Sequence, residues 1–493
     1  MDKAAGTNAS GGVERINVEP INSPENRTLY KAREAIYPKR VSGKYRRLKW
    51  VIMVLTLGVY YILPWVRWER GANEPDQAIL VDFAGSRFYF FAIEIWPDEL
   101  YYVTGLLILA ALGLFLATAL FGRIWCGYTC PQTVWTDLYI AVERMIEGDR
   151  NKRMKLDKAP WSTDKIMKKV SKHTIWILIG MATGGAWIFY FHDAPTIAAQ
   201  FFKGQAPFTA YFYCALLTMT TYIFAGSMRE QVCTYMCPWP RIQAALTDED
   251  TLQVTYKKDR GEPRGPHKKG DSWDGRGDCV SCRACVAACP MGIDIREGAQ
   301  LECINCALCI DACDDIMAKV DRPLSLIGYD TDANMARREA GEKPKFNYIR
   351  PRILVYSVML VLVASVMSWT LFSRATVNLN VIRDRTPPFV KLSDGSVRNA
   401  YTVKIVNRDN VERTFLLDVK GPPEMVVSAA GDNFEENNHQ VVVLDDSVRS
   451  IRLFVTLPPE ALDKASLPIS VTARDIATGE EALNPTTFIT GGR

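Results

Sequence analysis

Histidine is scarce in this chain, since only four of its 493 residues are His. A haem b in a membrane usually needs pairs of axial histidines, so this shortage argues against haem. The sequence also lacks a G-x-G-x-x-G motif after a strand, a P-loop and a His-rich tract, which argues against bound NAD or flavin. The formal net charge is only +4, which is too small to indicate nucleic acid as a partner.

Cysteine is plentiful, and its distribution is uneven. Eight of the 13 cysteines fall within 35 residues, and none lies beyond residue 373. The eight form two consecutive copies of the spacing C-x-x-C-x-x-C-x-x-x-C, the first followed by Pro290 and the second by Asp314. Bacterial ferredoxins hold [4Fe–4S] clusters with this spacing. Zinc ribbons and disulfides are the alternatives, but zinc sites rarely use two four-Cys runs this close together.

The ferredoxin rule divides these eight cysteines into two predicted ligand sets. In two-cluster ferredoxins the fourth Cys of each run ligates the other cluster. The first predicted set is Cys279, Cys282, Cys285 and Cys313. The second is Cys303, Cys306, Cys309 and Cys289. Two linked clusters predict one-electron chemistry.

Long apolar stretches predict a membrane protein. Five of them have the length and the lack of charge that membrane helices need. They are residues 50–66, 102–121, 174–191, 209–226 and 353–372. Buried helices of a large soluble protein are the alternative, which would explain one such stretch better than five. The predicted fold is therefore multidomain, with a transmembrane bundle of five helices and the cysteine-rich segment between the fourth and the fifth.

The distribution of basic residues predicts the orientation of this bundle. Residues 123–172 hold 11 Lys and Arg, whereas residues 67–100 hold three. The positive-inside rule then places the N-terminus and the cysteine-rich segment in the cytoplasm of a bacterial inner membrane, and the C-terminus in the periplasm. The first 49 residues carry 11 Lys and Arg, which is too much charge for a cleaved signal peptide.

Four further cysteines form a second repeated motif, C-x-Y-x-C-P, after the second and the fourth predicted helix. They are Cys126, Cys130, Cys233 and Cys237. The i, i+4 spacing predicts that both sulfurs of a pair lie on one helix face, and the Pro after each pair ends or redirects the helix. Four soft sulfurs suit Cu(I) or a redox-active dithiol pair, so these are the candidate catalytic and copper-binding residues. The alternative is four small apolar residues that fill helix contacts, as we expect of the remaining Cys214.

The rest of the chain divides by composition. Residues 1–43 read as a polar, loosely attached cytoplasmic segment, and residues 44–250 carry the first four predicted helices with both C-x-Y-x-C-P motifs. Residues 277–335 form the predicted ferredoxin-like domain, and residues 350–373 the fifth helix. The apolar segment 78–97 either lies along or re-enters the outer membrane surface, or packs as an exported loop.

From residue 375 to residue 493 the hydrophobic period changes to two. Short alternating runs stand between clusters of Gly, Pro, Asn and Asp, which predicts an antiparallel immunoglobulin-like β-sandwich. The runs are 376–381, 400–406, 414–419, 440–444, 450–455 and 469–473. Nothing in this part resembles a catalytic cluster, so we expect a docking or structural domain.

Residues 278–314 and both C-x-Y-x-C-P motifs resemble those of the cytochrome c oxidase accessory proteins, the CcoG, FixG and RdxA family. The helix order and the β-rich tail fit the same family. The resemblance implies two [4Fe–4S] clusters on the eight cysteines from Cys279 to Cys313. It also implies a role in maturing cbb-type haem–copper oxidases, as a cupric reductase that converts Cu(II) to Cu(I) with the help of the membrane cysteines.

The expected partners follow from this function. They are membrane lipid, oxidase subunits or copper chaperones, a separate electron donor (a reductase, a flavodoxin or a quinol) and a second copy of the chain. The alternative function is that of an electron-transfer subunit in a respiratory pathway, similar to the quinol-dehydrogenase subunits. Those subunits are not expected to carry the exported β-sandwich. A third possible function is a non-catalytic scaffold in which the clusters only stabilise a small domain. Two linked clusters argue against this function.

Overall fold

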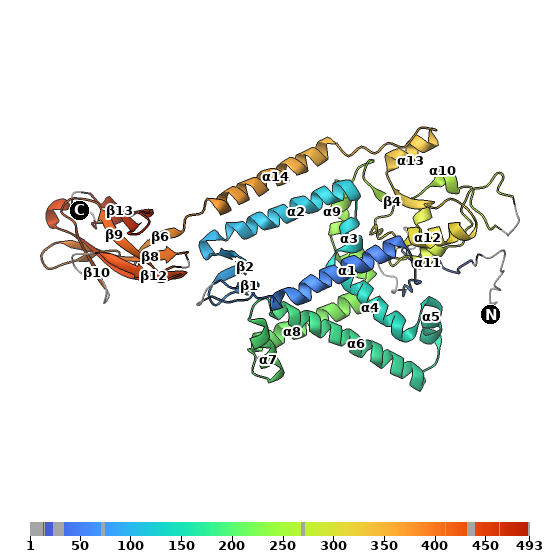
Figure 1. Cartoon of the computed structure of the whole chain (residues 1–493), viewed down its shortest axis with the longest axis horizontal. Helices are drawn as coiled ribbons and strands as arrows, with labels where there is room; N and C mark the ends of the chain where they lie inside the picture. The colour runs from blue at the N-terminus through green and yellow to red at the C-terminus, as the bar shows by residue number, and fades with distance from the viewer. Residues whose placement is uncertain are drawn as a thin grey trace. The chain divides into compact units, whose positions relative to one another are not determined.

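This computed structural model describes residues 13, 15–22, 34–70, 74–267, 272–409, 411–430, 439–462 and 464–491. The chain divides into two compact units, residues 1–367 and 368–493. Figure 1 shows that the first unit is mainly helical and that the second is built of strands.

Four helical segments in the described part of the chain are long and apolar enough to cross a membrane. They are Lys44–Trp65, Pro97–Phe121, Phe208–Met228 and Pro351–Phe372. They contain α1 (Lys44–Ile62), α2 (Tyr101–Phe121), α8 (Phe208–Thr221) with the π-helical turn η4 (Tyr222–Met228), and α14 (Pro351–Phe372). Four of the five predicted stretches therefore lie in such helices, and the predicted count of five is not confirmed.

The remaining predicted stretch, 174–191, lies mostly in α6 (Thr163–Ile188). This 26-residue helix begins with several lysines and carries His173 and Thr183 further along, which lowers its mean hydropathy. It packs along α8. At Gly184 an added Cβ would lie 2.6 Å from the carbonyl oxygen of Cys214, so only glycine permits this close approach. Cys214 itself is buried at this helix contact, away from the other cysteines.

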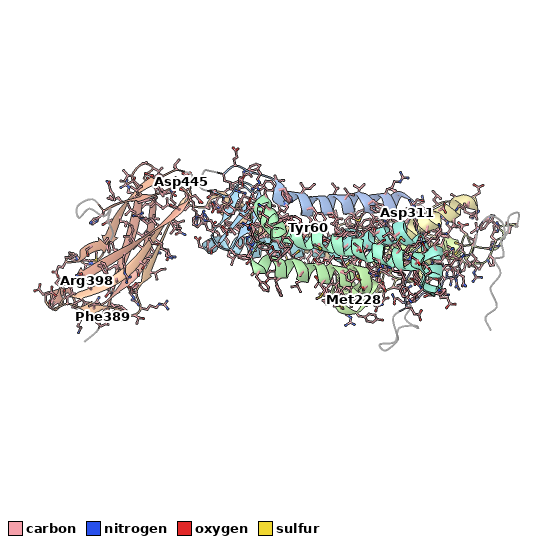
Figure 2. All side chains as sticks on the ribbon, turned by 90° about the horizontal axis from the view of Figure 1, so that it is seen from below. Tyr60, Met228, Asp311, Phe389, Arg398 and Asp445 are labelled. Carbon is pink, nitrogen blue, oxygen red and sulfur yellow. The ribbon has the colours of Figure 1, made fainter. Side chains whose placement is uncertain are left out.

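Short helices connect these long ones. They are α3 (Ile124–Tyr128), α4 (Pro131–Glu147), α5 (Arg150–Lys158), α7 (Ala194–Phe202), the π-helical turn η5 (Val232–Met236) and α9 (Trp239–Leu246). Figure 2 labels Tyr60 and Asp311, which lie toward opposite ends of α1. The carboxylate of Asp311 accepts hydrogen bonds from the backbone N–H groups of Tyr45 (3.2 Å) and Arg46 (2.7 Å) and so caps the start of this helix.

The apolar segment 78–97 forms a small three-stranded antiparallel sheet. Its strands are β1 (Ile79–Asp82), β2 (Arg87–Phe90) and β3 (Ile93–Ile95). The charges that interrupt the apolar sequence are satisfied within it, because Arg87 pairs with Glu94 at 3.0 Å and stacks on the ring of Trp96. The segment is thus a packed β-meander, which fits the interpretation as a packed loop, and its predicted position along the outer membrane surface stays a prediction.

The cysteine-rich module is built on a two-stranded antiparallel sheet, β4 (Gln253–Tyr256) with β5 (Ile327–Asp330). The helices α11 (Ala284–Ala288) and α12 (Leu308–Lys319) pack against each other beside it. The predicted boundary at residue 277 leaves out β4, because a four-residue strand before a polar linker has too little pattern to be recognised.

Part of the N-terminal segment is docked on this module. The backbone N–H of Ile16 donates to the carbonyl of Cys282 (3.0 Å), and that of Ile21 donates to the carbonyl of Gly292 (2.9 Å). The prediction of loose attachment is therefore wrong for residues 15–22, where apolar residues alternate with polar ones. Residues 1–12, 14 and 23–33 of the predicted segment lie outside the described residues.

The second unit confirms the predicted immunoglobulin-like sandwich. One sheet has the strand order β10-β12-β8-β6, with β7 paired to β8, and the other has the order β11-β9-β13-β14. The strands are β6 (Val377–Arg383), β7 (Val390–Lys391), β8 (Val397–Asn407), β9 (Arg413–Lys420), β10 (Val426–Ala430), β11 (Gln440–Val443), β12 (Ser447–Leu457), β13 (Ser466–Asp475) and β14 (Glu481–Ile489). Alternate residues of both sheets, such as Tyr401, Phe415 and Leu453, form its core.

All six predicted strands are present, and β7, β10 and β14 were not predicted. β14 is an edge strand whose residues are mostly exposed or half-buried, and it contains Pro485. Proline is tolerated at a sheet edge, but in a sequence it argues against a strand.

The glycine contact between α6 and α8 makes a test of this fold. Gly184→Ala should lower the free energy of unfolding by about 1–3 kcal/mol, because the new methyl group overpacks the contact with Cys214. The measurement is a denaturant titration in detergent followed by circular dichroism. Gly185→Ala is the matched control, since nothing lies within 4 Å of its added Cβ. An equal loss in both variants would contradict close α6–α8 packing.

Candidate metal centres

The eight cysteines of the module line two neighbouring cavities. The first cavity is lined by Cys279, Cys282, Cys285 and Cys313. The second is lined by Cys289, Cys303, Cys306 and Cys309, and Cys285 also reaches it. Below, these groups are the first and the second cysteine set. Each set takes three cysteines from one run and the fourth from the other, so the cavities follow the crossed arrangement that the spacing predicts.

The backbone repeats the same unusual conformation in both runs. Ser281 and Arg283, on either side of Cys282, have φ of 53° and 57°. Asn305 and Ala307, on either side of Cys306, have φ of 53° and 58°. Left-handed conformations cost free energy in residues other than glycine, so four of them in equivalent places indicate a backbone wrapped around a bound group.

The spacing of the sulfurs fits a polynuclear cluster better than a single metal ion. All 13 cysteines are free thiols, which excludes disulfides among them in this structure. Tetrahedral zinc with Zn–S bonds of about 2.3 Å needs sulfurs roughly 3.8 Å apart. In the described residues no three Cys sulfurs lie within 4.8 Å of one another. The two cysteine sets therefore fit a wider group, as [4Fe–4S] clusters are, in an apolar shell that includes Val254, Ile295 and Leu326.

The C-x-Y-x-C-P cysteines stand at breaks in the helices. Cys126 lies in α3, whereas Cys130 is the extended residue before α4, which begins at Pro131. Cys233 lies in the π-helical turn η5, and Cys237 is the extended residue that ends it. The prediction that both sulfurs of a pair share one continuous helix face is wrong. The prolines end the helix one residue earlier than the spacing assumes, since the residue before Pro avoids helical conformation.

The two motifs nevertheless converge beside the second cysteine set. Cys126 and Cys233 both pack against the apolar group that carries Cys289, Cys303 and Cys306. Gly127 fixes the first motif there, because an added Cβ would lie 2.6 Å from the carbonyl oxygen of Ile304. The first motif thus touches the backbone of the loop that holds the second cysteine set.

A buried ion-pair network holds the second motif. Arg229, between η4 and η5, has a φ of 44° and pairs with Glu143 of α4 at 3.0 Å. The same carboxylate binds Arg153 at 2.6 Å and Lys172 at 3.4 Å. Removing one partner of such a buried network leaves an uncompensated charge, so the network fixes the turn that leads into Cys233.

The thiols of the two motifs influence one another electrostatically. Burial, together with negative charge on the neighbouring motif sulfurs, raises the pKa of Cys126 and of Cys233 to about 12. Burial also raises the pKa of Cys130, with a contribution from Cys237. At neutral pH these thiols are therefore protonated until a metal ion or another electrophile replaces the proton.

Arg123 lies between the motif thiols and the second cysteine set. Its guanidinium donates to the carbonyl oxygens of Leu301 and Cys303 on one side and of Pro240 on the other. Burial lowers the pKa of Arg123, while the nearby sulfurs of Cys303 and Cys126 act in the opposite direction. The residue therefore joins the two sites and adds a positive charge between them.

Gln243 contacts the first motif from α9. The side chain is fully buried, its Oε1 lies 3.3 Å from Cys126 Sγ, and its Nε2 has no hydrogen-bond partner among the described residues. A carboxamide can present either end to sulfur, because its oxygen accepts from a thiol and its NH₂ donates to a thiolate.

Comparison with known proteins identifies the family. The chain is 49% identical to the nitrogen fixation protein FixG of Rhizobium meliloti over 97% of both chains. It is 52% identical to protein RdxB of Cereibacter sphaeroides over 83% of this chain and 87% of RdxB. It is 48% identical to protein RdxA of the same organism over 87% of this chain and 91% of RdxA. The chain belongs to the FixG family.

Family models divide this FixG-family chain as its structure does. A 4Fe-4S dicluster domain matches residues 228–332, which include both cysteine sets and the second motif. A 4Fe-4S binding domain matches residues 103–147, which include the first motif. The IG-like fold at the C-terminus of FixG matches residues 367–491. The predicted family is confirmed, and the chain is a membrane iron–sulfur electron-transfer protein of the oxidoreductase kind.

Three residues of the site are not predicted from the sequence. Gly127 lies within the first motif and could have been noticed as a glycine between two cysteines. Arg123 and Gln243 carry no local signal, since their roles depend on segments more than 100 residues away. Met236, which lies within the second motif and could offer a thioether, is 52% exposed and so does not indicate a buried ligand.

The orientation of the Gln243 amide decides how it affects Cys126. We expect Gln243→Leu to speed the alkylation of Cys126 by iodoacetamide at pH 9 about fivefold, because the protonated thiol loses an acceptor worth about 1 kcal/mol. Mass spectrometry of the labelled peptide measures this rate. Gln205→Leu, at an exposed position, is the control. Slower alkylation would show instead that the NH₂ end of the amide faces the sulfur and stabilises the thiolate.

Proposed function

We propose that this chain reduces Cu(II) to Cu(I) for the assembly of a cbb-type cytochrome c oxidase. The observation that carries the proposal is the convergence of four motif thiols beside the second cysteine set. The second cysteine set, which would hold a source of single electrons, is then in contact with the motif thiols, which are soft ligands. Copper is the substrate, and each Cu(II) ion takes up one electron that a separate donor has supplied.

We also propose which cysteines hold each of the two clusters. Cys279, Cys282, Cys285 and Cys313 would hold one [4Fe–4S] cluster, and Cys289, Cys303, Cys306 and Cys309 the other. When bound, the clusters store and pass on single electrons. The chain contributes an apolar shell that excludes water from them, and Arg123 ties the second set to the motif loops.

The motif thiols favour the product of the reduction. Thiolate sulfur prefers Cu(I), whereas Cu(II) prefers nitrogen and oxygen ligands in tetragonal geometry. Cys126, Cys130 and Cys233 are half-buried and Cys237 is exposed, so an ion can reach the group from one side. Since no three described sulfurs lie within 4.8 Å, the group is not a closed cage for copper storage. This openness supports transient contact with the ion followed by its release.

The proposal includes an orientation and partners. The module and the N-terminus would lie in the cytoplasm, and the sandwich in the periplasm of a bacterial inner membrane, as the basic residues of 123–172 favour. The sandwich would dock an oxidase subunit or a copper chaperone. The donor would be a reductase, a flavodoxin or a quinol. A quinol-dehydrogenase-like role is the alternative, and the sandwich domain disfavours it.

The iron content and the crossed ligand sets can be tested together. Anaerobically purified protein should bind about eight iron atoms, on the rule of two four-iron clusters. The double variant Cys289→Ser/Cys303→Ser alters one proposed set and should lose about four of the eight iron atoms. The double variant Cys303→Ser/Cys313→Ser alters both sets and should lose nearly all iron.

Iron analysis with electron paramagnetic resonance makes the measurement. The reverse order of the two losses would show that each run holds its own cluster. Bound zinc in place of iron would contradict the clusters altogether. About twelve iron atoms, as three four-iron clusters need, would place iron on the motif thiols and contradict the copper proposal.

Copper reduction is tested at the motif thiols. Replacing Cys126, Cys130, Cys233 and Cys237 by Ser should lower the rate of Cu(II) reduction by the reduced protein to about a tenth or less, because the sulfur ligands that favour Cu(I) are lost. A Cu(I)-specific chelator reports the rate. Cys214→Ser, at the α6–α8 contact, is the control. An unchanged rate in the quadruple variant would contradict the thiol site, and quinol oxidation without any effect of copper would favour the alternative function.

A further inference from the structure

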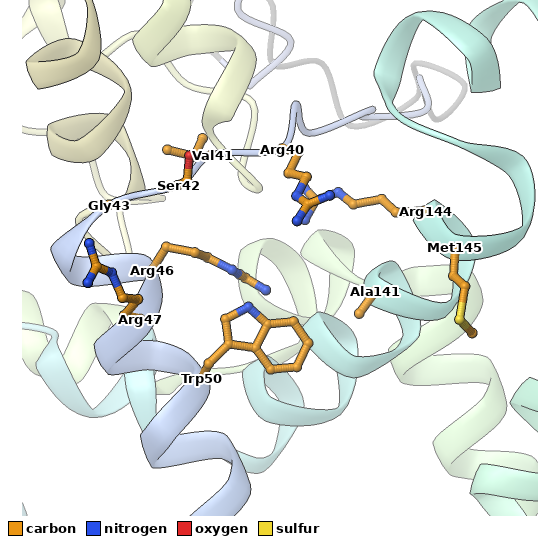
Figure 3. A pocket seen from close by; sticks show the side chains of 10 residues that line it. All are labelled: Arg40, Val41, Ser42, Gly43, Arg46, Arg47, Trp50, Ala141, Arg144 and Met145. Carbon is orange, nitrogen blue, oxygen red and sulfur yellow. The ribbon is translucent and has the colours of Figure 1, made fainter.

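A basic cavity opens at the start of α1, at the helix end that Asp311 caps. Its volume is about 640 Å³, which is large enough for a small ligand or a headgroup. Figure 3 shows four arginines around it, Arg40, Arg46, Arg47 and Arg144, together with Trp50. Among the residues that line it in the described part of the chain there is no acid.

The arginines are only partly neutralised by the protein. Arg46 pairs with Asp137 at 2.8 Å and stacks on Trp50. Arg144 donates to the carbonyl oxygen of Pro38 (3.0 Å), but its buried Nε has no partner among the described residues. Burial and the neighbouring guanidinium groups of Arg46 and Arg153 lower the pKa of Arg144 to about 10. The site thus concentrates positive charge that an anion would relieve.

The surroundings of the cavity show which kind of anion it fits. α1 is an apolar membrane helix, and the cavity lies at its first turns. Trp50 and Met145 form an amphipathic rim, with 38% and 73% of their surface exposed. Leu48 and Val51 continue the exposed apolar surface along the helix. A ligand that combines a phosphate with hydrocarbon chains therefore finds both a charged cavity and an apolar surface beside it.

We propose that this cavity binds the phosphate headgroup of an anionic phospholipid. The guanidinium groups hold phosphate by charge-assisted hydrogen bonds, and the acyl chains follow the exposed face of α1. The lipid would bind beside the side chain of Arg46, whose backbone N–H is held by Asp311 of the cysteine-rich module. A bound lipid would therefore stabilise the position of the module at the membrane surface.

The test measures lipid binding to the full-length protein in neutral detergent by native mass spectrometry. Wild-type protein should retain phosphatidylglycerol more tightly than phosphatidylcholine. The triple variant Arg40→Gln/Arg47→Gln/Arg144→Gln should bind phosphatidylglycerol at least about tenfold more weakly, as basic residues contribute cumulatively to anionic-lipid binding. Arg46 is left unchanged because its pair with Asp137 is buried.

The matched control is Lys152→Gln/Lys155→Gln/Lys158→Gln, which removes the same charge from exposed positions of α5. It should bind phosphatidylglycerol as wild type does. The single variant Arg47→Glu, at an exposed position, should weaken phosphatidylglycerol binding severalfold. It tests the same cavity if the triple variant fails to fold. Unchanged iron content in each variant shows that the module is intact.

Three results would overturn the proposal. Equal retention of phosphatidylglycerol and phosphatidylcholine would remove the preference for anionic lipid. An equal loss of phosphatidylglycerol binding in the arginine and lysine triple variants would show that binding depends on general surface charge and not on this cavity. If inorganic phosphate binds as tightly as phosphatidylglycerol and displaces it completely, the cavity serves a free anion and not a lipid.

Discussion

The contact between Gly127 and the loop of Ile304 is the constraint on which the site depends. It brings a helix end at the membrane against the backbone that carries the second cysteine set, with no room for a side chain between them. Arg123 reinforces this contact from the same short segment, because it donates to carbonyls of that loop and to Pro240 after the second motif. Electron transfer between groups held on these elements therefore needs no movement of the module.

Helix irregularity is what makes the convergence possible. A continuous helix through Cys126 and Cys130 would carry both sulfurs away along its axis, at 1.5 Å per residue. The break at Pro131 and the π-helical turns before Cys237 instead fold the chain back toward the module. The ion pairs of Glu143 with Arg153 and Arg229 hold these breaks in a buried environment.

The sequence predicted what depends on local spacing and periodicity. The cysteine sets that the ferredoxin spacing predicts line two neighbouring cavities, the second of which Cys285 also reaches. The period of two anticipated the sandwich, although the edge strand with Pro485 was missed. The strands of the meander at 78–97 pair locally, but its nearly continuous apolar sequence has no period of two from which to predict them. The docking of residues 15–22 could not be predicted, because their hydrogen-bond partners are distant in sequence. The same reason hid Arg123 and Gln243. The predicted count of five membrane helices is not confirmed because of α6, which packs along α8 but is not among the helices apolar enough to cross a membrane in the described part of the chain.

The equal backbone conformations around Cys282 and Cys306 have a consequence for the direction of electron flow. Two sites with the same ligand type and the same local geometry are intrinsically close in redox potential, so their surroundings must set any difference between them. Those surroundings differ: the first cysteine set faces Tyr256 and the Arg296–Asp294 pair, whereas the second lies next to Arg123, whose guanidinium donates to backbone carbonyls. A nearby cation favours the site that gains an electron. The duplicated half-modules are thus made unequal by what packs against them, and any difference in potential that directs electrons from one to the other comes from these neighbours.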